Sequence, residues 1–171
     1  MTKRGIIVLA IVSMALILPG AAFSQALEST DTEFRLFGIE LGALAGYNLE
    51  DEESVMGRSF ALSLAVLENM QIGISAVTFD GQLTTIASPQ QYVGMRFDYF
   101  FTEQLALALM VGNAAGANIG GSIGAHYLIV RSQPADMFSS ALKLKADYFF
   151  NDEQGIGGGT IAIGLAGSFG L

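Results

Sequence analysis

The one histidine of the chain, His126, is the residue whose type most readily supports catalysis. A histidine that acts as a general base needs a serine or another nucleophile within hydrogen-bond reach. Ser122 lies four positions earlier, and in an extended strand that spacing separates the two residues by about 13 Å. The sequence therefore favours a hydrogen-bonded histidine inside the protein, and we expect no catalytic site.

Charged side chains occupy alternate positions in three otherwise apolar stretches. They are Glu40, Arg96, Asp98, Lys143, Lys145 and Asp147. In a closed interior an unpaired charge costs several kcal/mol, so three acids and three bases should neutralise one another. The sequence predicts that Arg96 and the two lysines bridge the three carboxylates. An ion path along the same residues is the alternative.

Other patterns that could carry chemistry are weak. The chain has no cysteine, which excludes disulfides, thiolate catalysis and a cysteine-linked lipid. The acids of 48–57 are contiguous, unlike the spaced ligands of a calcium loop, and favour a solvated loop over a cation site. The glycine run 155–160 lacks the following Lys-Ser/Thr and helix of a phosphate loop. We expect neither a metal nor a cofactor.

The elements that position these residues are clearest in the stretch 91–111. From Val93 to Phe101 every second residue is large and apolar, and most residues between them are small or charged. This period of two predicts a β-strand, and a polar turn joins it to a second alternating run, Leu105 to Val111. A wholly apolar face opposite a small, partly charged face is typical of a strand between lipid and a narrow lumen.

The same alternation predicts eight strands along the chain. Their approximate ranges are 35–47, 58–67, 71–79, 91–101, 105–111, 118–130, 139–150 and 159–171. Connections alternate between mostly longer and mostly shorter, as extracellular loops and periplasmic turns do. The predicted fold is all-β: an eight-stranded antiparallel up-and-down transmembrane β-barrel. A helical bundle built on 105–130 and 154–171 is disfavoured, because glycine recurs there and helices leave the alternation unexplained.

Targeting and composition agree with this interpretation. Lys3 and Arg4 precede an apolar run that ends in small residues, which predicts a signal peptide over 1–24, cleaved before Gln25. We assign 25–33 as a periplasmic lead-in and 34–171 as the barrel. Sixteen acidic against eight basic residues argue against a nucleic-acid partner. A hydrophobic content of 51% with 14% charged residues means that much apolar surface faces something other than water.

Aromatic residues gather near the predicted strand ends, as in the two interfacial girdles of membrane barrels. One end would carry Tyr47, Tyr148 and Phe150, and the other Tyr99, Phe101 and Tyr127. With its signal peptide, eight alternating strands and apolar last strand, the chain resembles the small eight-stranded outer-membrane barrels, the family of the OmpA transmembrane domain and OmpX. The resemblance covers 34–171.

The resemblance implies a bacterial outer-membrane location, contact with outer-membrane lipid, and a lumen plugged by side chains. It also implies biogenesis through periplasmic chaperones and the barrel-assembly machinery. Family members usually end in an aromatic residue that this machinery reads. This chain ends Ser-Phe-Gly-Leu, so Phe169 or Leu171 would serve as the assembly signal.

The expected function is a non-enzymatic barrel with a structural or surface-interaction role, in which the extracellular loops would bind any ligand. A narrow channel, or a conduit for small apolar molecules, is the alternative. A lipid-modifying enzyme is a third class, and it requires a serine–histidine constellation near the outer rim that the sequence does not show.

Overall fold

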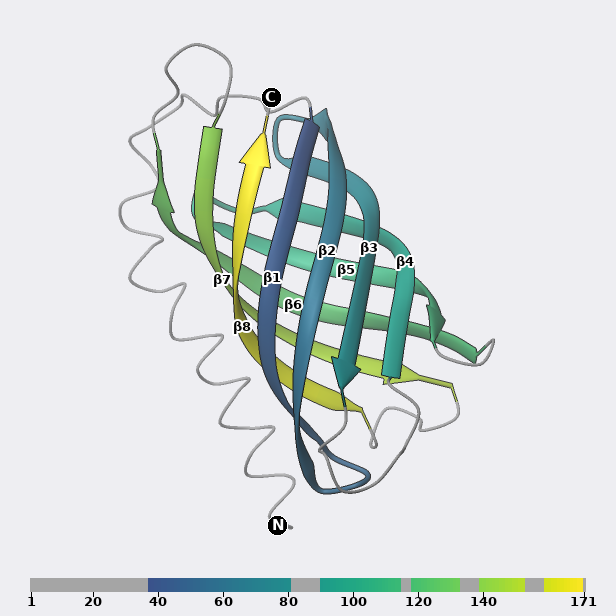
Figure 1. The fold of residues 1–171 in the computed structure, drawn as a ribbon. Helices are drawn as coiled ribbons and strands as arrows, with labels where there is room; N and C mark the ends of the chain where they lie inside the picture. Colours follow the sequence, from purple (N-terminus) through teal and green to yellow (C-terminus); the bar gives the residue numbers. More distant parts are fainter. Residues whose placement is uncertain (1–36, 81–89, 115–117, 133–138, 153–158, 171) are drawn as a thin grey trace.

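The computed structural model describes residues 37–80, 90–114, 118–132, 139–152 and 159–170. In these ranges eight antiparallel strands form one sheet, and it closes because β1 pairs with both β2 and β8 (Figure 1). The strands are β1 (Phe37–Asn48), β2 (Glu53–Leu67), β3 (Met70–Asp80), β4 (Gln90–Phe100), β5 (Leu105–Ala114), β6 (Asn118–Arg131), β7 (Ser139–Asn151) and β8 (Thr160–Gly170). The predicted eight-stranded antiparallel barrel is confirmed. Within the described residues, no helix has the length and apolarity needed to cross a bilayer.

The register makes the barrel strongly staggered. A path of paired residues that leaves β1 at Gly38 returns to β1 ten residues further along, at Asn48. It runs through Ser63, Gly73, Arg96, Met110, Ser122, Phe149 and Thr160. For eight strands this stagger corresponds to a tilt of about 40° and an interior just wide enough for side chains to fill. Figure 1 shows the tilt: β1 and β2 run steeply at the front, while β5 and β6 cross behind them.

Burial alternates along the strands as a period of two requires. On β1, Glu40 and Leu44 are buried. Leu41, which lies between them, and Tyr47, which follows them, are exposed. The described buried residues include charged side chains from β1, β4, β6 and β7, while many large apolar side chains are exposed. Each charged position that the sequence placed on the lumen face lies on the inward side of its strand.

Two predicted boundaries are wrong. The expected loop 48–57 is a short turn, 49–52, because β2 already begins at Glu53 and buries Val55. The turn is stabilised by the Asn48 side chain, whose Oδ1 accepts hydrogen bonds from the amides of Glu50 and Asp51. The run of acidic residues before Val55 obscured the alternation at the start of β2. Likewise β5 continues to Ala114, so part of the connection expected between the strands 105–111 and 118–130 is strand.

Close approach of two strands depends on a pair of glycines. Gly94 of β4 pairs with Gly112 of β5, and both lie on the inward face. A Cβ added to Gly112 would collide with the carbonyl oxygen of Val93 and the Cα of Gly94. Both are backbone atoms, so the strands would have to move apart to accept a side chain.

We therefore predict that Gly112→Ala lowers the free energy of unfolding by about 1–3 kcal/mol, the usual cost of overpacking. Gly167→Ala is the matched control, since a Cβ there has no atom within 4 Å. It should change stability by less than about 0.5 kcal/mol. Urea unfolding followed by far-ultraviolet circular dichroism measures both. Equal stabilities for the two variants would refute the close-approach explanation.

Candidate functional site

The interior of the barrel is built around the carboxylate of Glu40 in β1. Its Oε1 accepts hydrogen bonds from Arg96 Nη1 at 2.8 Å and Lys145 Nζ at 2.9 Å. Its Oε2 accepts one from Lys143 Nζ at 3.0 Å. Three cations from β4 and β7 thus converge on one carboxylate, and the lone pairs of that carboxylate are satisfied by charge-assisted bonds.

Arg96 links the acids to one another. Its Nε donates to Asp98 Oδ1 at 2.8 Å, and Nη2 lies 2.8 Å from Asp98 Oδ2. The two residues are separated by one position on β4, so their side chains share the inward face. Arg96 therefore binds Asp98 through two nitrogens and Glu40 through its terminal nitrogens, which fixes the orientation of the guanidinium.

His126 completes the cluster. Arg96 Nη2 lies 3.1 Å from Nδ1 of His126, and Nε2 lies 2.9 Å from Asp147 Oδ1. Because a guanidinium can only donate, Nδ1 must accept, and the ring proton sits on Nε2 and is donated to Asp147. Both ring nitrogens are engaged by groups other than Ser122. This arrangement leaves no nitrogen to activate a serine.

These side chains are called the ion network below. Its members are Glu40, Arg96, Asp98, His126, Lys143, Lys145 and Asp147. The structure brings together all six charged residues that the sequence placed in the lumen, and it adds His126, which sequence reasoning had treated separately. Ser122 is buried on the same strand as His126 and borders a small space between this network and Phe149.

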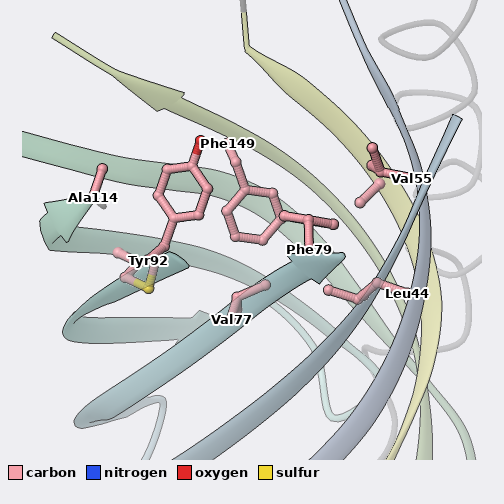
Figure 2. Close-up of a cluster of buried hydrophobic side chains, with 9 residues drawn as sticks. Leu44, Val55, Val77, Phe79, Tyr92, Ala114 and Phe149 are labelled. Atoms are coloured by element: carbon pink, nitrogen blue, oxygen red, sulfur yellow. The ribbon is translucent and has the colours of Figure 1, made fainter. Parts of the chain in front are cut away.

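A second buried group was missed by sequence reasoning. Phe79, Tyr92 and Phe149 are each 1% exposed, and Figure 2 shows their rings together inside the barrel. They lie beyond the ion network along the barrel, because Phe149 is two positions past Asp147 on β7. Ring centroids are 5.1 Å apart for Phe79–Phe149 and 5.2 Å for Tyr92–Phe149, with edge or tilted geometry. We call these three side chains the aromatic plug. Their apolar neighbours are Leu44, Val55, Val77, Met110, Ala114 and Ala162.

The aromatic plug escaped notice for a definite reason. Phe149 stands between Tyr148 and Phe150, and a run of three aromatic residues gives no visible alternation. Parity counted from Lys145 and Asp147 on the same strand would have placed Phe149 inward. The alternation of 91–101 puts Tyr92 on the lumen face, and Phe79 lies near the end of β3, but small or charged side chains were expected on that face.

The opposite end of the lumen contains a cavity of about 100 Å³. We call it the vestibule. Its walls are small residues such as Ala61, Ala65 and Ala106, and its floor is formed by Glu40, Arg96 and Lys143. It lies at the end of the barrel with the short turns at 68–69 and 101–104. Small side chains leave the lumen partly empty at this end. At the other end of the barrel the aromatic plug fills the lumen.

The predicted aromatic girdles lie at the two ends of the barrel. Tyr99 and Phe101 contact each other beside the β4–β5 turn, with centroids 5.0 Å apart, and Tyr127 donates to Gln104 Oε1 of that turn. Tyr148 and Phe150 stack at 6.3 Å toward the other end, where Tyr47 is 38% exposed. Their role at a membrane interface stays a prediction.

Several sequence predictions concern residues beyond these. Phe169 faces outward and is 56% exposed. Leu171, the signal peptide 1–24 and the lead-in 25–33 lie outside the described residues. Among the residues that are described, no group of three or more His, Cys, Asp or Glu side chains is arranged to hold a metal ion.

Comparison with known proteins returns no matching family model and no matching curated protein. Solved structures do match. One is a de novo designed transmembrane β-barrel with 15% sequence identity and a TM-score of 0.44. The match covers 77% of this chain and 94% of the designed chain.

We predict that Glu40→Gln destabilises the barrel by about 3–5 kcal/mol, because it leaves three buried cations without their shared anion. Glu68→Gln, in the exposed β2–β3 turn, removes the same charge outside the ion network and should change stability by less than about 0.5 kcal/mol. Denaturant unfolding measures both variants. A Glu40→Gln barrel as stable as the Glu68→Gln barrel would show that the network is not stabilised by this carboxylate.

Proposed function

We propose that the chain is an integral β-barrel of the bacterial outer membrane, related to the OmpA and OmpX type. In this proposal residues 1–24 direct secretion and are removed, and periplasmic chaperones and the assembly machinery insert the barrel. The barrel has no enzymatic activity and its lumen is closed. Its role is structural, or lies in surface interaction through loops whose ligand is unknown.

The composition of the outer wall carries this proposal. All eight strands present large side chains to the outside that are at least 39% exposed. Examples are Leu41, Phe60, Ile74, Met95, Val111, Ile123, Leu142 and Ile163. Soluble monomers rarely expose apolar patches beyond a few hundred Å², whereas this apolar surface runs round the whole barrel. A bilayer is the surrounding that such a surface requires.

Charge on the outer wall is confined to one pair. In the described strands the outward-facing charged residues are Arg58 and Asp80, whose side chains are 75% and 60% exposed and lie 3.9 Å apart. Asp80 is the last residue of β3, so Arg58 extends toward the strand end. Long basic side chains in membrane proteins reach the interface in this way.

The height of the apolar band agrees with a bilayer. β1 has 12 residues, and at about 3.3 Å per residue and a tilt of about 40° it spans about 30 Å along the barrel axis. Outer-membrane barrels present an apolar band of about 25 Å flanked by aromatic girdles. The aromatic pairs Tyr99–Phe101 and Tyr148–Phe150 lie toward opposite ends of this span.

The packing of side chains in the interior supports a closed lumen and argues against a channel. The ion network and the aromatic plug fill successive layers of the barrel, and the space between them is about 10 Å³. That volume holds at most about one water molecule. Lack of enzymatic activity is supported by His126, whose two nitrogens are both engaged within the network.

A charge on the outer wall tests the membrane proposal. Met95 is 56% exposed midway along β4, and we expect Met95→Arg to cost about 2–4 kcal/mol in lipid vesicles. Gln91→Arg, near the end of the same outward face, should cost about 0–1 kcal/mol. Urea titration of the barrel in vesicles measures the difference. On a wall that faces water, both variants would have similar, small effects.

Conductance tests the closed lumen. We expect the wild-type barrel to give no steady single-channel steps in planar lipid bilayers, because side chains block the lumen in two layers. Lys143→Glu, which reverses a charge at the vestibule, should be equally silent. Steady steps whose ion selectivity changes with this substitution would support the channel alternative and overturn the closed lumen.

A further inference from the structure

The vestibule is bordered by a cation, Lys143, that makes one hydrogen bond to the described part of the protein. Lys143 Nζ donates to Glu40 Oε2 at 3.0 Å, and among the described residues this is the one acceptor that the structure gives it. An ammonium group carries three donors. The Lys143 side chain is 16% exposed, against 7% or less for Glu40, Arg96 and Lys145, so it is the basic member of the ion network most open to the vestibule.

Lys143 has fewer carboxylate partners than the other two bases of the ion network. Glu40 carries one negative charge and shares it among Arg96, Lys143 and Lys145. Arg96 is also balanced by Asp98, and Asp147 lies 4.0 Å from Lys145. Lys143 has no second carboxylate of this kind among the described ion pairs.

A second donor lies beside this lysine. Ser168 lines the vestibule, is 5% exposed, and its buried Oγ has no hydrogen-bond partner among the described residues. Lys143 of β7 pairs with Ala166 of β8, two positions from Ser168, so both side chains are inward and diagonal neighbours. Diagonal neighbours on paired strands lie about 7–8 Å apart at Cα, a separation that one carboxylate group can bridge.

The other residues that line the vestibule indicate the polarity and charge of a ligand that would fit. Its lining includes three alanines and the inward side chains Phe100 and Leu128, with the polar Ser63 and Gln71 beside them. Glu68 and Glu103 also border the cavity, together with Arg131. Glu40 and these two acids repel a polyanion such as a phosphate ester more strongly than a single carboxylate, because the repulsion grows with the charge of the ligand.

We propose that the vestibule is a binding site for a small monocarboxylate with an apolar body, such as a short-chain fatty acid. Its carboxylate accepts hydrogen bonds from Lys143 Nζ and Ser168 Oγ, and its alkyl chain lies along the alanine walls toward Phe100. This site is separate from the proposed membrane role, because it depends on the lumen and not on the outer wall.

The test uses hexanoate, isotope-labelled at its carboxyl carbon, titrated into the refolded barrel in lipid nanodiscs. Empty nanodiscs give the background from partition into lipid. We expect saturable binding that Lys143→Met weakens about tenfold or more, since the variant loses a charge-assisted hydrogen bond to the carboxylate. Arg58→Met, which removes a positive charge from the outer wall, is the matched control and should bind like wild type.

Two further measurements keep the proposal falsifiable if Lys143→Met does not fold. Ser168→Ala, a small change at a buried site, should weaken hexanoate binding severalfold. Hexanol, which has the same body without the charge, should bind the wild-type barrel about tenfold more weakly or worse, for the same reason. Equal affinity for hexanol and hexanoate, or no saturable hexanoate binding above empty nanodiscs, would overturn the proposal. Neither result would bear on membrane insertion, which the outer-wall substitutions test.

Discussion

The convergence of three cations on Glu40 is the interaction on which the arrangement of the interior depends. It joins β1 to β4 and β7, and His126 extends it to β6. Because the side-chain period of a strand is two, a slip of one residue in any of these strands would turn its charges to the outer wall. The cost of an unpaired charge in lipid or in a closed lumen then penalises every alternative register.

The lumen is divided along its axis into three layers with different side chains. The aromatic plug closes one end with three packed rings, the ion network fills the middle with paired charges, and the vestibule is left open by small residues. The stagger of ten residues makes this order possible. Because of it, residues at different positions along their own strands lie at the same height along the barrel axis. Closure and a ligand-sized space therefore occur in the same narrow barrel.

The fold and the composition of the two faces could be predicted from the sequence, because both depend on a local period of two. The charged residues facing inward on β1, β4 and β7 could be identified from alternation alone, and bridging between the bases and the acids was expected from their equal numbers. Which acid each base meets could not be predicted, since Arg96 and Glu40 are 56 positions apart and Lys145 and Glu40 are 105 apart. Such contacts depend on the stagger of the closed barrel, which hydrophobic alternation does not encode. Phe149 was missed because its neighbours are aromatic, and Val55 because the acids before it suggested a loop.

A closed barrel with charges inside is compatible with either water or lipid outside, so the interior alone does not decide the surroundings. Soluble barrels of this size also pack their lumen, but their outward side chains are polar or charged. Here the outward positions between the two aromatic ends are almost wholly apolar, and Arg58, their one basic residue, extends toward an acid at the strand end. Burying that wall in a bilayer removes its apolar surface from water, which is favourable by about 25 cal/mol for each Å² removed. The proposed membrane location therefore rests on the apolar outer wall, and the ion network keeps each buried charge beside an opposite one.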